Sequence, residues 1–88
     1  MTQNTVTIFS SAGCGPCKML KSKLVDPKTG EKRVSWDFSV KNIDGNEDLA
    51  LKYGFREVPA TVITNTEGLV HTIIGCGANY ITDVERWL

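Results

Sequence analysis

Apolar side chains alternate with polar ones in two early parts of the chain, which is the spacing of a half-buried β-strand. The first run, residues 6–9, is short and β-branched and is followed by a loop of small residues, so it predicts a buried strand. The second run, residues 34–43, carries apolar side chains at every second position from Val34 to Val40 and predicts a longer, half-buried strand. Its two aromatic residues, Trp36 and Phe38, are expected in the core.

Between these runs the apolar residues change to helical spacing. Cys17, Leu20 and Leu24 stand at i, i+3 and i+7, which places them on one face of an amphipathic helix over residues 15–25. The Asp-Pro-Lys-Thr-Gly run at residues 26–30 follows, and this helix is expected to end there because proline cannot continue it.

A second, shorter helix is predicted after the second strand. Asp44 is expected as its N-cap, with Glu47 in the capping-box position and Gly54 at its end. Residues 60–64 and 69–74 are apolar runs on either side of a turn, which predicts an antiparallel hairpin.

The last segment, residues 79–88, has Ile81, Val84 and Leu88 at helical spacing and predicts a third helix. The element order is therefore β-α-β-α-β-β-α. A β-α-β opening needs a parallel strand pair joined by a right-handed crossover, whereas the hairpin is antiparallel. We expect an α/β fold with a four-stranded mixed sheet and three flanking helices.

Length and composition support a single domain, residues 1–88, with one hydrophobic core. The chain has 88 residues, of which 41% are hydrophobic, too few for a second core. Ten basic and ten acidic side chains cancel, so charge does not favour a nucleic-acid or membrane partner. No apolar run approaches the length of a signal-peptide core or a membrane span. We therefore expect a monomeric cytoplasmic protein.

Candidate chemistry is concentrated in the motif Cys14-Gly15-Pro16-Cys17, at the start of the first predicted helix. Residues at i and i+3 are neighbours on a helix, so the two sulfurs can reach bonding distance. Pro16 is expected at the first helical position, with Gly15 relieving crowding at the entry. Cys14 faces unpaired backbone N–H groups, which favour the thiolate.

These features predict a reversible dithiol in which Cys14 is the nucleophile and Cys17 the resolving thiol. The redox-active centre is then the Cys14–Cys17 disulfide, with no metal and no other cofactor. A structural zinc site would need four ligands, and the remaining candidates, His71 and Cys76, lack the spacing of a second knuckle. A purely structural disulfide closing so small a loop would constrain the unfolded chain very little.

The chain resembles the thioredoxin superfamily over nearly its whole length. The C-G-P-C-K run at residues 14–18 is similar to the thioredoxin active-site motif, and the Val-Pro-Ala-Thr run at residues 58–61 is similar to a second family segment. Two further stretches that resemble the family are Asn42-Ile43-Asp44 and Lys52-Tyr53-Gly54-Phe55-Arg56.

The resemblance implies the thioredoxin fold and a cis Val58–Pro59 bond lying against the dithiol. In the family, the residue before this proline pairs its backbone with the substrate chain as a short added strand. Val58 and Pro59 are therefore expected to bind substrate, together with Gly13 beside the dithiol and Gly77 before the last helix. Cys76 borders the same groove, either as a reactive thiol or as a small buried hydrophobe.

The resemblance also implies a protein-disulfide reductase, an electron carrier in cell redox homeostasis. Its expected substrates are protein disulfides, with ribonucleotide reductase as one candidate target. Its expected electron source is thioredoxin reductase or glutathione.

Three positions depart from the thioredoxin pattern. Gly13 stands where thioredoxins usually carry a tryptophan, which removes an apolar contact surface. Ile8 and Val40 replace a buried aspartate and its accompanying lysine, a consistent double loss because a lone buried charge is costly. The obvious general base for Cys17 is thereby missing, so its proton is expected to pass to water or to the departing thiolate.

The missing charged pair and the short N-terminus also resemble glutaredoxins and the compact thioredoxin-like proteins of archaea and bacteriophages. Against a glutaredoxin stand the C-G-P-C motif, where C-P-Y-C is usual, and Glu57, which would place negative charge beside a glutathione carboxylate. A glutathione-coupled glutaredoxin remains one alternative. A metal or iron–sulfur module and a redox-inert interaction subunit are alternatives of other classes.

Overall fold

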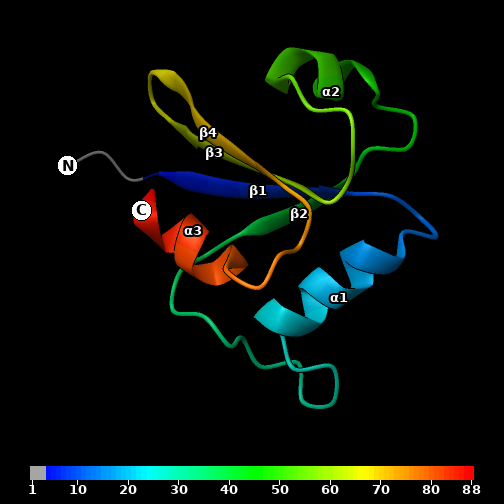
Figure 1. Cartoon of the computed structure of the whole chain (residues 1–88), viewed down its shortest axis with the longest axis vertical. Helices are drawn as coiled ribbons and strands as arrows, with labels where there is room; N and C mark the ends of the chain where they lie inside the picture. The colour runs from blue at the N-terminus through cyan, green and yellow to red at the C-terminus, as the bar shows by residue number, and fades with distance from the viewer. Residues whose placement is uncertain (1–3) are drawn as a thin grey trace.

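The computed structural model describes residues 4–88 and has the predicted element order (Figure 1). Each helix and strand forms within a few residues of the pattern that predicted it, with the exception of the second strand. The elements are β1 (Thr5–Ser10), α1 (Gly15–Leu24), β2 (Ser39–Asn42), α2 (Asp48–Tyr53), β3 (Ala60–Asn65), β4 (Gly68–Ile74) and α3 (Tyr80–Arg86).

The four strands form one mixed sheet in the order β2-β1-β3-β4. β1 pairs with β2 in parallel, and the β1–β3 and β3–β4 pairs are antiparallel. The predicted α/β fold with a four-stranded mixed sheet and three helices is thus confirmed. Within residues 4–88, no helix has both the length and the apolar character needed to cross a membrane.

Helices cover both faces of the sheet, with α1 and α3 on one side and α2 on the other (Figure 1). The α1/α3 side holds the larger buried cluster: Val6, Ile8, Leu20, Leu24, Ile63, Tyr80 and Val84. The α2 side holds a second cluster: Phe9, Ile43, Phe55, Ala60 and Val62. Alternate residues of β1 therefore enter opposite clusters, as the pleat of a strand requires.

The predicted strand over residues 34–43 is wrong in its first half. β2 spans only Ser39–Asn42, and residues 33–36 form bends. Trp36 and Phe38 are partly buried against the α1/α3 cluster as expected, and the Trp36 indole N–H donates to a Glu85 carboxylate oxygen at 3.0 Å. The alternation therefore reflects side-chain burial along a bent segment that precedes β2, and backbone pairing with β1 begins only at Ser39.

A buried hydroxyl pair connects β3 to α3. Thr61 and Tyr80 are 0% and 1% exposed, and their side-chain oxygens are hydrogen-bonded to each other. Burial raises the pKa of Tyr80 to about 12, so this hydroxyl keeps its proton at neutral pH. Without this hydrogen bond, both hydroxyls would be buried in an apolar cluster with no hydrogen-bond partner.

We expect Tyr80→Phe and Thr61→Val each to lower the free energy of unfolding by about 1–3 kcal/mol, because each leaves the other hydroxyl buried without its partner. The double variant should lose less than the sum of the two single losses, since it removes both polar groups together. Denaturant unfolding of all four proteins measures this coupling. Strictly additive losses would contradict the pairing.

Candidate active site

The two motif cysteines lie at the N-terminus of α1 and form a disulfide with a Cα–Cα distance of 5.2 Å. Cys14 is the N-cap residue, with extended backbone angles, and Cys17 is the third residue of the helix. The two sulfurs differ in accessibility: Cys17 is only 3% exposed, whereas Cys14 is half-buried. Cys14 is thus the more exposed residue of the pair, and the roles of nucleophile and resolving thiol stay predictions.

The helix N-terminus supplies hydrogen bonding to the outer sulfur. The backbone N–H of Cys17 donates to Cys14 Sγ at 3.2 Å. The first turn of α1 contains no acidic residue, so the positive end of the helix dipole is not opposed there. In the reduced protein the same N–H group would stabilise a Cys14 thiolate.

Proline lies one position later than predicted. Because α1 begins at Gly15, Pro16 occupies the second helical position and not the first. Its missing N–H still removes no helical hydrogen bond, since the first four N–H groups of any helix have no partner inside the helix. The motif thus starts the helix without weakening it.

The antiparallel pairing of β1 with β3 brings a distant segment to the dithiol. Phe9, near the end of β1, pairs with Ala60 at the start of β3, so the residues after β1 and those before β3 share one edge of the sheet. The Val58–Pro59 peptide bond is cis, and the Val58 carbonyl oxygen lies 3.7 Å from Cys14 Sγ. Both expectations drawn from the resemblance, the cis bond and its place against the dithiol, are confirmed.

Gly13 adopts a positive φ of 78°, in the left-handed region that side chains other than glycine disfavour. The absence of a tryptophan at this position therefore accompanies a turn in which a larger residue would be strained. Gly13 is exposed, and it leaves the approach to Cys14 free of a flanking side chain.

Two further predicted residues, Cys76 and Gly77, lie in the loop between β4 and α3. The Lys23 ammonium donates to the Gly77 carbonyl oxygen at 2.9 Å, which attaches this loop to α1. Cys76 is a free, half-buried cysteine that packs against the α1/α3 cluster. The two interpretations of Cys76, as a reactive thiol and as a small buried hydrophobe, both stay predictions.

Ile8 and Val40, which replace the charged pair of thioredoxins, differ in their burial. Ile8 is 2% exposed within the α1/α3 cluster, as expected for an apolar replacement of a buried aspartate. Val40 is its partner in the β1–β2 register but remains 40% exposed. The expectation that the two pack as one buried apolar pair is therefore met by Ile8 only.

A metal site would need at least three His, Cys, Asp or Glu side chains close together. No such group is found among residues 4–88. His71 instead stacks on Trp87, with 4.3 Å between the ring centroids.

Asp44 does not cap α2 as predicted, because this helix begins at Asp48 with Glu47 as its N-cap residue. The Asp44 carboxylate instead accepts a hydrogen bond from the backbone N–H of Ala12 at 3.0 Å. Asp44 thus holds the loop that leads into the dithiol. This role was missed, although β1 and β2 are parallel and the carboxyl ends of parallel strands meet at one edge of the sheet.

We expect Asp44→Ala to lower the free energy of unfolding by about 1 kcal/mol and to slow attack of Cys14 on a small aromatic disulfide, because the Ala12 N–H loses its acceptor. Asp44→Asn keeps an acceptor oxygen in the same place and should retain most of both properties. Stopped-flow absorbance and denaturant unfolding test the pair. Equal losses in the two variants would show that the charge, and not the hydrogen bond, is what matters.

Comparison with known proteins agrees with this geometry. The family model described as Thioredoxin matches residues 1–86. Thioredoxin of Porphyra purpurea is 36% identical over 67 residues, which cover 76% of this chain and 62% of that protein. Chloroplast thioredoxin M-type of Chlamydomonas reinhardtii is 29% identical over 82 residues, covering 91% and 58%. The chain thus spans less than two thirds of the length of these relatives.

Solved structures show the same fold at lower identity. Reduced thioredoxin pre-protein of Schistosoma mansoni superposes with a TM-score of 0.74 at 21% identity, covering 98% of this chain and 80% of that one. The short form of thioredoxin F from spinach chloroplast gives 0.74 at 23% identity, covering 97% and 75%.

Proposed function

The chain belongs to the thioredoxin family, and from that premise we propose that it reduces protein disulfides through Cys14 and Cys17. One observation carries the proposal: the half-buried Cys14 sulfur accepts an N–H at the start of α1, while its partner Cys17 is buried behind it. Such a pair has one sulfur for a target to reach and a second that can act only after the first has reacted.

The reaction begins when the Cys14 thiolate attacks one sulfur of the target disulfide. That S–S bond breaks, the second target sulfur leaves as a thiolate, and Cys14 is joined to the target in a mixed disulfide. Cys17 then loses its proton to water or to the departing thiolate and attacks Cys14 Sγ. The target leaves with two electrons gained, and the Cys14–Cys17 disulfide forms.

The target chain is proposed to lie across Gly13, the Val58–Pro59 segment and the Cys76–Gly77 loop. The carbonyl oxygen of Val58 supports this placement, because it lies 3.7 Å from the attacking sulfur. An extended target segment could pair there with the backbone of Val58.

Thioredoxin reductase is the proposed electron source, because the relatives named above are thioredoxins. Ribonucleotide reductase remains a candidate target, and a cytoplasmic location and a role in electron transport remain proposals. Glutathione is the alternative donor. Turnover with NADPH and thioredoxin reductase, compared with turnover with NADPH, glutathione and glutathione reductase, separates the two.

Insulin reduction tests the proposed activity. With dithiothreitol as reductant, the protein should accelerate the precipitation of the insulin B chain, and a Cys14→Ser/Cys17→Ser double variant should not. A redox-inert interaction subunit would show no acceleration in either form, and that result would overturn the proposal.

A further inference from the structure

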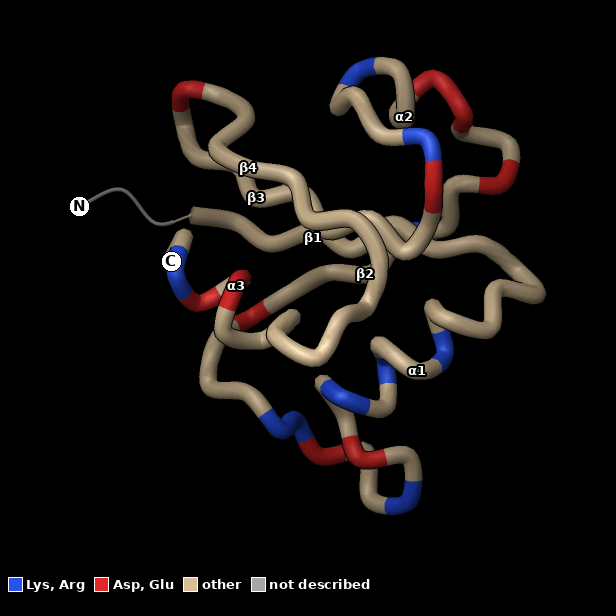
Figure 2. The backbone as a smooth tube through the Cα atoms, viewed as in Figure 1, with Lys and Arg blue, Asp and Glu red and all other residues tan. Residues whose placement is uncertain are grey.

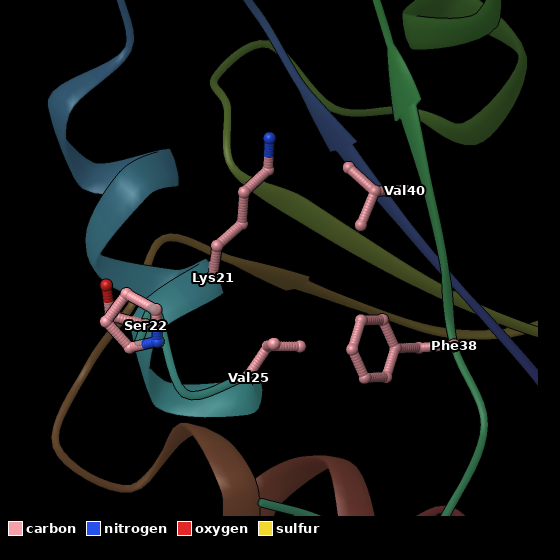
Figure 3. Close-up of a pocket in the computed structure, with 6 residues that line it drawn as sticks. Lys21, Ser22, Val25, Phe38 and Val40 are labelled. Atoms are coloured by element: carbon pink, nitrogen blue, oxygen red, sulfur yellow. The ribbon is translucent and has the colours of Figure 1, made fainter. Parts of the chain in front are cut away.

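One face of α1 connects the reactive sulfur to an apolar pocket. Lys18 and Lys21 lie on one face of α1, with Cys14 as the cap residue before the helix and Val25 as the cap residue after it; these four residues are called the α1 row. The pocket at its far end has a volume of about 300 Å³. It is lined by Lys21 and Ser22 of α1, Val25 and Pro27 after the helix, and Phe38 and Val40 of the segment that contains β2 (Figure 3).

The α1 row carries positive charge that no carboxylate of the described residues neutralises. Lys18 and Lys21 are exposed, and α1 contains no acidic residue. The two salt bridges found within residues 4–88 join Lys32 to Asp37 and Arg33 to Asp26, and neither involves this row. Figure 2 shows blue, basic segments along α1, whereas the red, acidic segments lie on other parts of the chain. A partner with a carboxylate therefore complements this face.

The other wall of the pocket belongs to the edge of the sheet. β2 is the outermost strand, and all four of its residues are exposed. Val40 and Phe38 project from the segment that contains β2 to the same side, toward α1, and Val25 faces Phe38 across the pocket (Figure 3). An edge strand presents backbone donors and acceptors to an extended chain, so a partner segment could lie beside β2 while one of its side chains enters the pocket.

We propose that the α1 row and its pocket bind an extended segment of the target protein, with a carboxylate facing Lys18 and Lys21 and an apolar side chain in the pocket. This inference rests on the proposed disulfide reduction and names the class of target. This target segment is a second one, in addition to the segment proposed to pair with Val58. Its contacts would favour some target disulfides over others that Cys14 can reach equally well.

The helix fixes the spacing of this segment. Lys21 and Val25 follow Cys14 by seven and eleven residues, or about 10 Å and 16 Å along the helix axis. In an extended chain only every second side chain lies on the same face as the target cysteine, and two residues cover about 7 Å. The acidic side chain is thus expected two residues from the target cysteine, near Lys18 and Lys21. The apolar one is expected four residues from it, about 14 Å along the row, beside the pocket that Lys21 and Val25 line.

Activated peptides test this arrangement. Each peptide carries one cysteine joined to thionitrobenzoate, whose low thiol pKa makes it the leaving group when Cys14 attacks the peptide sulfur. The first peptide has Glu two residues and Leu four residues from this cysteine, so that all three side chains share one face of the extended chain. Two others replace Glu with Lys or Leu with Ser, and each is made in both chain directions. The protein is the Cys17→Ser/Cys76→Ser variant, in which Cys14 is the only thiol.

Release of thionitrobenzoate is followed by absorbance, and each rate is divided by the rate with the mixed disulfide of free cysteine, which has no anchoring side chains. The Glu–Leu peptide should react on the order of fivefold faster than the Lys–Leu peptide at low salt. The difference should shrink in high salt. Lys21→Glu should reverse the preference, and Val40→Thr should reduce the advantage of Leu over Ser.

Lys28→Glu is the matched control, because it makes the same change in charge at an exposed turn residue outside the α1 row. It should leave the preference of the parent protein unchanged. Equal rates for the three peptides, or equal effects of Lys21→Glu and Lys28→Glu, would overturn the docking proposal while leaving disulfide reduction intact. No reaction with the cysteine mixed disulfide would instead overturn the proposed function, and the docking proposal with it.

Discussion

Cys14→Ser is expected to lower kcat/KM for protein-disulfide reduction by at least about a thousandfold, because a serine hydroxyl is not ionised at neutral pH and cannot replace a thiolate nucleophile. Cys17→Ser should behave differently. Its Cys14 can still attack a target, but the buried sulfur that would release the target is gone, so mixed disulfides should accumulate.

Non-reducing electrophoresis of each variant after exposure to protein disulfides distinguishes these states. The Cys17→Ser variant should give adducts that dithiothreitol removes, and the Cys14→Ser variant should give none. The opposite pattern, in which Cys14→Ser remains active and Cys17→Ser forms no adduct, would reverse the assignment of the two sulfurs. That result would also conflict with the 3% exposure of Cys17.

The residues that could be predicted from sequence are those whose geometry is local. The dithiol, the buried face of α1 and the hairpin each depend on spacings within one element, and all three are present. The Cys14–Val58 contact joins residues 44 positions apart, so no local pattern could indicate it. It was expected only because of the family resemblance, and it depends physically on the register that pairs Phe9 with Ala60.

Two of the errors, in the second strand and at the start of α2, have a common physical cause. Alternation over residues 34–43 is compatible with a strand, and the Asp44–Glu47 spacing is compatible with a helix cap. In the folded chain, however, a side chain of each pattern bonds to a distant residue instead. Trp36 is held by Glu85 of α3, and Asp44 by the Ala12 N–H. A local pattern indicates which side chains need burial or a partner, whereas the folded chain determines where these are found.

Leu24→Ala should be strongly destabilising, because it truncates a fully buried side chain of α1. Leu24 is 0% exposed in the α1/α3 cluster, at the last position of the helix. Its truncation is expected to cost about 2–5 kcal/mol, from lost burial and the cavity left behind. Since domains are stable by only about 5–15 kcal/mol, a substantial fraction of the variant could be unfolded at modest denaturant concentration.

Leu51→Ala supplies the matched control, because it makes the same chemical change on α2 at a side chain that is 88% exposed. Its cost should stay within about 0.5 kcal/mol. Urea unfolding of both variants, followed by tryptophan fluorescence, measures the difference. If Leu24→Ala lost no more stability than Leu51→Ala, then α1 would not be anchored through its buried face. The position of the dithiol at the start of that helix would in that case need another physical explanation.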